Sequence, residues 1–243
     1  MTPEQAASAL SGPIWSFGRR FMFDPATYEL AAPYGFEGID FYFLGRGGVL
    51  GDAPPEVVAA AFGFFEPARL SRRWTRGRSR LDPRSSAELF ADACAAFGRT
   101  DLVEVDFDRL DHLLARVLEA ADDAGLALFA GWRTMATADD VKGRVAQRMF
   151  ALRELRGGLH LLSVRASGIA PRDAVLVDGG PPNAELLGYE APFEDVSHLA
   201  GAMARAERLT NALAATPLEV LDDTQRLELV ELATTAHPSP AGS

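Results

Sequence analysis

The sequence is nearly devoid of cysteine, with one in 243 residues. A single thiol excludes a disulfide framework and any zinc or iron–sulfur site built from cysteines of this chain. No apolar run approaches the ~18 residues that a transmembrane helix needs, so we expect no membrane span. The N-terminal segment has neither a basic region nor a long apolar stretch, and we therefore expect a cytoplasmic protein.

The short motifs of common catalytic centres are also missing. The chain has no GxSxG or SxxK nucleophile motif, no GxGxxG or Walker-A loop and no HExxH pair. No two of its four histidines have metal-ligand spacing, so we expect neither a metal nor a cofactor. Paired acids at 139–140 and 222–223 precede helical segments and are typical of helix caps. Cys94 lies on an apolar helical face and is expected to be an inert core residue.

Lysine, asparagine and isoleucine are scarce, with one, two and three residues, whereas alanine occurs 41 times and arginine 23 times. This bias is typical of a genome rich in GC codons and favours an actinobacterial source. Arginine number alone is therefore weak support for a binding site.

Charge of the two signs is unevenly distributed. The net charge is −10, yet residues 69–84 contain seven arginines and a single acid. A basic tract of this kind can follow a phosphate backbone. However, Gly77 and Pro83 interrupt any recognition helix there, and the acidic remainder of the chain repels nucleic acid. We expect a loop that borders a pocket or contacts an acidic partner, and we regard nucleic-acid binding as the weaker alternative.

The remaining sequence predicts an all-α protein. Apolar residues are 48% of the chain, which is enough for a full core, and the length suits one large domain. Thr2 and Asp24 are capping residues followed by proline, a pattern typical of helix starts, and amphipathic segments follow them. Alanine, leucine, glutamate and arginine, which favour helix, are abundant throughout. We expect a compact domain of about nine or ten helices over residues 1–236. The segment 126–132 is expected to be an extended connector, and 237–243 a disordered tail.

Residues 43–67 have a weak sequence similarity to residues 162–192. Both run from an apolar helix end with an arginine, through glycine, to a helix that starts at proline. A duplication would give two lobes, 1–100 and 101–236, with a cleft between them. Chance similarity explains the pattern equally well, because a helix followed by glycine, proline and a second helix is a common local arrangement.

Aromatic residues are concentrated in one quarter of the chain. Residues 15–65 contain 13 of the 22 aromatics. Such a cluster suits the apolar wall of a ligand pocket, although a plain aromatic core is the simpler interpretation. If a pocket exists, we expect Phe64 and Trp132 among its walls.

Four polar residues are the candidates for chemistry. His160 follows the Gly157-Gly158 pair, whose cost within a helix often marks a kink or a close backbone approach. It is the candidate general acid or base, with Tyr42 as its possible partner. The simpler alternative is a histidine that bonds a helix carbonyl. Arg46 and Arg165 are the candidate anchors for an anionic or carbonyl group of a substrate.

Four segments together carry a family resemblance. They are 38–70, 126–132, 148–162 and 206–221, which include the Tyr42–Arg46, Pro54–Val58 and Gly157–His160 elements. In this order they resemble the SalK-type actinobacterial family, which is often labelled a helix-turn-helix family and has members in natural-product gene clusters. Residues 176–205 depart from the winged-helix-like stretch of many relatives. The resemblance implies a role in specialised metabolism and supplies no catalytic residue set.

Two hypotheses follow from these observations. The first is a protein that binds an apolar or aromatic small molecule in a helical cleft, with a cofactor-independent enzyme and a homodimer as more specific forms of this hypothesis. The second is a DNA-binding transcriptional regulator, which depends on the family label and on the arginine tract.

Overall fold

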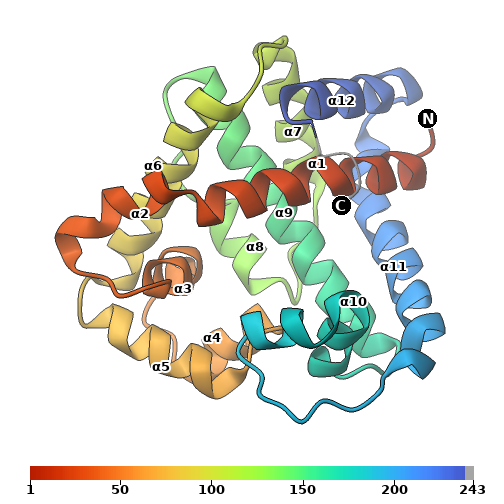
Figure 1. Cartoon of the computed structure of the whole chain (residues 1–243). Coiled ribbons are helices and arrows are strands. Elements are labelled where there is room, and N and C mark those ends of the chain that lie inside the picture. The colour runs from red at the N-terminus through yellow and green to blue at the C-terminus, as the bar shows by residue number, and fades with distance from the viewer. Residues whose placement is uncertain (239–243) are drawn as a thin grey trace.

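The computed structural model describes residues 1–238, and these contain twelve α-helices, four short 3-10 helices and no strand (Figure 1). The all-α prediction is confirmed, with more helices than the nine or ten expected. The helices are α1 (Pro3–Phe23), α2 (Pro25–Ala31), α3 (Asp40–Gly47), α4 (Pro55–Phe62), α5 (Pro67–Arg78), α6 (Pro83–Asp101), α7 (Phe107–Ala120), α8 (Ala127–Trp132), α9 (Val141–Ala166), α10 (Pro171–Leu186), α11 (Ala200–Ala215) and α12 (Asp223–Ala236).

Helix starts follow the side chains that can satisfy free backbone N–H groups. The Thr2 hydroxyl accepts from the backbone of Gln5, whose side chain accepts in return from the backbone N–H of Thr2, which closes a capping box at α1. Asp222 forms a second capping box with Gln225 at α12, and the Asp140 carboxylate accepts from the backbone N–H of Gly143 at the start of α9, so these acids have the structural role expected of them.

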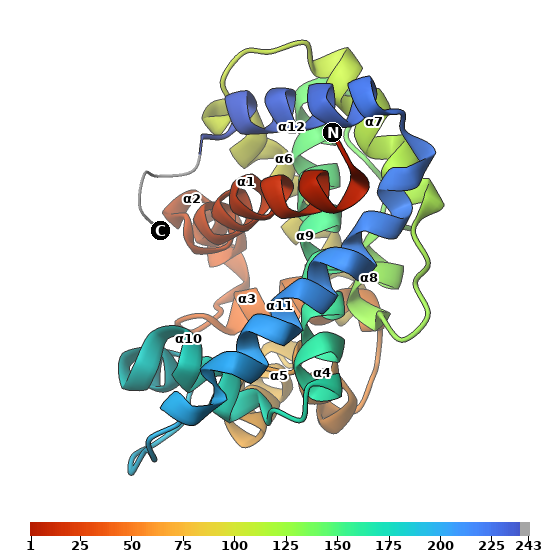
Figure 2. The ribbon, with the colours of Figure 1, turned by 90° about the vertical axis from the view of Figure 1, so that its right-hand side faces the viewer.

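Helix α9 runs through the middle of the molecule and organises the rest of the fold (Figures 1 and 2). Helices α1, α6, α7, α8 and α11 pack around it. One continuous hydrophobic core extends from Ala6 to Ala236. A small cluster lies where α10 and α11 meet the end of α9, and another lies between α10 and the segment that follows it. Residues on both sides of position 100 share this core, and the division into two related lobes stays a prediction.

The segment 126–132 is a helix and not the extended connector expected. The carbonyl of Leu126 accepts from the backbone N–H of Ala130, and α8 follows. A short apolar run has no usable periodicity, so its sequence alone cannot separate helix from extended chain. Packing against α9 decides in favour of helix.

The arginine tract is also helical where a loop was expected. Both carboxylate oxygens of Glu66 accept from the first backbone N–H groups of α5, which then continues through Gly77. Gly77 is tolerated because α3 lies close to it: a Cβ atom at this position would lie 3.2 Å from the Cβ of Leu44. Close packing therefore overrides the low helix propensity of glycine.

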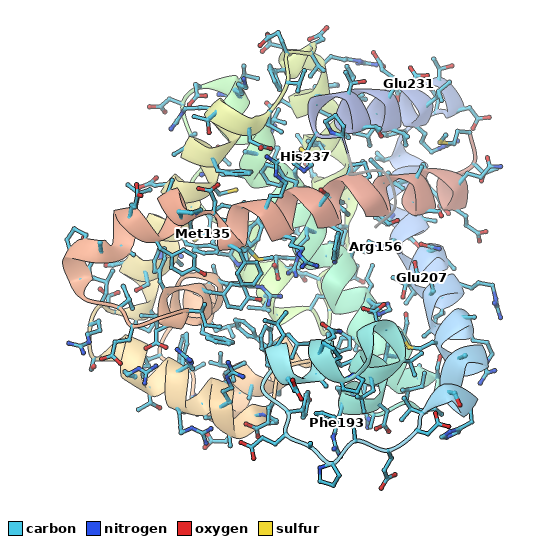
Figure 3. The ribbon with its side chains drawn as sticks, in the orientation of Figure 1. Met135, Arg156, Phe193, Glu207, Glu231 and His237 are labelled. Atoms are coloured by element: carbon cyan, nitrogen blue, oxygen red, sulfur yellow. The ribbon has the colours of Figure 1, made fainter. Side chains whose placement is uncertain are left out.

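The expected tail does not begin at His237. This residue is 1% exposed, and its ring nitrogens lie 2.7 Å from a carboxylate oxygen of Asp101 and 3.1 Å from the hydroxyl oxygen of Ser16 (Figure 3). The ring joins the end of α12 to α1 and α6. Residues 239–243 of the expected tail lie outside the described residues. Across residues 1–238, no helix combines the length and the apolar character needed to cross a membrane.

Candidate functional site

A cleft of about 1480 Å³ lies between α1 and α10, and residues of α9 line it as well. Most of the side chains that line it are apolar. The lining comes from the second half of α1, from α3, from the end of α4 and the turn after it, from the start of α8, and from α9, α10 and α11. The volume exceeds the ~300–1,000 Å³ typical of ligand pockets.

Four of the six predicted site residues line this cleft, and two do not. The four are Tyr42, Arg46, Phe64 and His160. Trp132 turns away from it: its Nε1 donates to the backbone oxygen of Arg46 at 3.0 Å, and its ring borders a separate cavity of about 300 Å³. Arg165 is exposed near the end of α9 and donates to the backbone oxygen of Ile169.

Most of the aromatic residues of the segment 15–65 divide between the core and the cleft. Phe17, Phe21, Phe41 and Phe43 are fully buried in the core, so the simpler interpretation holds for them. The members that line the cleft are Trp15, Phe23, Tyr42, Phe62, Phe64 and Phe65. Trp15 and Phe23 are 46% and 47% exposed, which leaves large apolar surfaces at the edge of the cleft.

A buried ion-pair network closes one wall of the cleft. Arg46 donates from Nε and Nη2 to the two carboxylate oxygens of Glu154, at 2.9 and 3.0 Å. Its Nη1 donates to the hydroxyl oxygen of Tyr42 at 2.9 Å. Arg153 adds a third bond to Glu154, at 2.6 Å. Because each guanidinium nitrogen of Arg46 donates to an acceptor within the protein, Arg46 fixes the position of Tyr42.

Both partners of this network remain charged although they are buried. Burial alone would raise the pKa of Glu154, but the charges of Arg46 and Arg153 and their hydrogen bonds outweigh it and hold that pKa below its usual value. Burial alone would lower the pKa of Arg46, and the charge of Glu154 raises it instead. Glu154 was not among the predicted site residues.

His160 has a defined tautomer. Its Nδ1 lies 3.1 Å from the hydroxyl oxygen of Thr210, and that hydroxyl donates its own proton to the backbone oxygen of Ala206 at 2.8 Å. The hydroxyl therefore accepts from Nδ1–H, and Nε2 keeps its lone pair. The ring of Phe64 lies 5.7 Å from the imidazole, centre to centre. His160 thus bonds a neighbouring helix through a side chain and not through a helix carbonyl.

An arginine and a glutamate join α9 to α11 beside His160 (Figure 3). Nη2 of Arg156 donates to Glu207, and the other carboxylate oxygen of Glu207 lies 3.6 Å from Nδ1 of His160. Nη1 of Arg156 is covered by protein and has no acceptor among the residues described. Sequence reasoning missed both residues. The available signal was the spacing of Arg153, Arg156 and His160, which places all three on one face of a helix.

Comparison with known families adds one finding. Residues 7–188 match a helix-turn-helix family, and this match covers well over half of the chain. The chain belongs to that helix-turn-helix family. Searches among curated proteins and among solved structures found no match.

The arginine tract of this helix-turn-helix family member is largely neutralised by its own acids. Arg73 and Arg76 both bind Asp40, which is 1% exposed. Three further arginines of the tract form ion pairs within the chain: Arg78 with Asp52, Arg80 with Glu37 and Arg84 with Glu88. Intramolecular pairing leaves less charge for a phosphate backbone than the sequence suggests.

The surroundings of His160 predict how stability depends on pH. Burial lowers the pKa of His160; Glu207 raises it and Arg156 lowers it further. As the pH falls below neutrality, the unfolded chain binds a proton at this position that the native protein does not, so the free energy of unfolding falls. His160→Gln should make the urea midpoint depend less on pH between about pH 7.5 and about pH 5.5.

The matched control is His112→Gln, which makes the same substitution at an exposed histidine of α7. An unchanged pH dependence in the His160 variant would contradict the assigned environment of this ring.

Proposed function

We propose that the protein binds a small apolar or aromatic molecule in the cleft between α1 and α10. The observation that carries the proposal is the cleft itself. Its volume is about 1480 Å³ and its lining is mostly apolar, whereas the remaining helices are closely packed. Apolar surface exposed on this scale marks a binding site more often than an accident of packing.

Two side chains give this site the means for acid–base chemistry. Nε2 of His160 is a free acceptor, because Nδ1 carries the proton. The Tyr42 hydroxyl accepts from Arg46, so its own proton remains for a ligand oxygen. A ligand carbonyl beside Tyr42 would be polarised, and His160 could accept a proton from a neighbouring position. This arrangement supports a cofactor-independent enzyme as the more specific form of the proposal.

The biological setting follows from the resemblance described above. Similarity to SalK-type relatives, some of which occur in natural-product gene clusters, supports a role in actinobacterial specialised metabolism. The alternative, a DNA-binding regulator, has the family label in its favour. The net charge of −10 and the internal pairing of the arginine tract argue against it.

Fluorescence of the neutral probe N-phenyl-1-naphthylamine tests this proposal. Its emission should rise and saturate at one molecule per chain, with a dissociation constant of roughly 1–100 μM for an apolar fit that no specific contact has optimised. Trp15 lines the cleft, and its emission should change in parallel. The Trp15→Phe variant removes that reporter while the probe still binds.

A rise that does not saturate would contradict the proposal. Salt-sensitive retardation of duplex DNA in a gel, together with absent probe binding, would favour the regulator.

A further inference from the structure

Two adjacent glycines in α9, Gly157 and Gly158, have different surroundings. A Cβ atom on Gly158 would lie 2.8 Å from a methyl carbon of Leu126, so packing against the start of α8 favours a glycine there. A Cβ atom on Gly157 would meet no atom within 4 Å. Glycine in a helix interior costs about 1 kcal/mol relative to alanine. Nothing within the protein requires that cost at Gly157, which lines the cleft.

Two arginines of α9 come just before this open position. Arg153 and Arg156 precede Gly157 by one turn and by one residue, and all three line the cleft. The stem of Arg153 lies against α1, where a Cβ on Gly18 would be 3.2 Å from it. Among the described residues, Nε and Nη2 of Arg153 have no acceptor, and neither atom is enclosed by protein. Arg153 lines the cleft and its side chain is 20% exposed, so these donors are available to a ligand.

The same wall carries one positive charge in excess. The charged groups that α3, α9 and α11 present to the cleft are three guanidiniums and two carboxylates, and the rest of the lining adds Arg19 and Arg20 against Asp24 and Asp178, which leaves the excess at one. His160 is uncharged near neutral pH because burial lowers its pKa. One negative charge would balance this wall, and a doubly charged phosphate would exceed it. The planar guanidinium fork also matches a carboxylate in two hydrogen bonds.

We infer that the ligand carries a single carboxylate, which binds over Gly157 between Arg153 and Arg156. This inference rests on the proposed function and names the chemical class of its ligand. The apolar body of the ligand lies toward Phe64 and the aromatic edge of the cleft. A small turn of the Arg156 guanidinium away from Glu207, which is half exposed, gives its unpartnered Nη1 an acceptor.

Competition between two matched aromatic compounds tests the inference. The probes are 2-naphthoate and its neutral isostere 2-naphthamide, each used to displace N-phenyl-1-naphthylamine from the full chain. Naphthoate should bind at least about tenfold more tightly than naphthamide. Arg153→Gln and Arg156→Gln should each reduce this preference to about twofold or less, with naphthamide binding unchanged.

Two further variants separate a direct role from a structural one. Glu207→Gln frees Arg156 and should strengthen naphthoate binding, which a merely structural arginine would not do. Arg165→Gln removes the same charge from the same helix outside the cleft and should have no effect. Added salt should weaken the binding of naphthoate to the unmodified protein and not that of naphthamide, a readout that requires no variant to fold.

The outcomes distinguish this inference from the proposal beneath it. If the probe and naphthamide bind but naphthoate has no advantage, the carboxylate assignment is wrong and the binding function stands. If none of the three compounds binds, the binding function itself is wrong.

Discussion

Replacing Glu154 by glutamine is expected to lower the free energy of unfolding by about 3–5 kcal/mol. The change leaves Arg46 and Arg153 facing each other without the carboxylate that compensates them, and the side chains of Arg46 and Glu154 are only 8% and 1% exposed. Urea denaturation followed by circular dichroism measures the effect. The control is Glu88→Gln, whose carboxylate pairs with Arg84 while both side chains are 56% exposed, and whose loss should cost less than about 1 kcal/mol.

A double variant shows whether the loss comes from unpaired charge. Arg46→Met combined with Glu154→Leu removes both charges and keeps similar volume, so it should be more stable than Glu154→Gln alone. If Glu154→Gln costs no more than Glu88→Gln, the buried network does not have the energetic role assigned to it.

Replacing Gly157 by phenylalanine is expected to weaken probe binding by more than about tenfold without destabilising the fold. The ring would enter the open space beside Gly157, and phenylalanine has a higher helix propensity than glycine. Titration with N-phenyl-1-naphthylamine measures the loss, and urea denaturation confirms that the variant is folded.

Gly201→Phe is the matched control for this change. Gly201 is also helical and also has no atom within 4 Å of a Cβ position, but it lies outside the cleft. Its variant should bind the probe as the unmodified protein does. Unchanged binding in the Gly157 variant would place the probe elsewhere.

Much of the helical fold could be predicted because its signals are local. Thr2 and Asp222 are capping residues followed by a glutamine at the right spacing, and the structure contains both capping boxes. Two elements could not be predicted this way. Helix α8 is too short for periodicity to reveal, and α5 continues through Gly77 because α3 packs closely there. Both depend on contacts distant in sequence.

The candidate site was partly accessible for the same reason. Tyr42, Arg46 and His160 are conspicuous in sequence, and the fold brings them to one cleft. Glu154 was missed because an acid between arginines on a helix is typical of a solvated face, whereas α9 is enclosed on several sides. Trp132 and Arg165 were misplaced because the choice between neighbouring faces of a helix depends on which partner packs there.

The location of a bound aromatic carboxylate tests the central claim most directly. A crystal of the protein grown with 6-bromo-2-naphthoate would reveal the bromine by its anomalous scattering. We predict a single strong peak in the cleft between α1 and α10, with the carboxylate over Gly157 and within hydrogen-bond distance of Arg153. A peak in the smaller cavity beside Trp132, on the outer surface or nowhere, in protein that binds the compound in solution, would contradict the account.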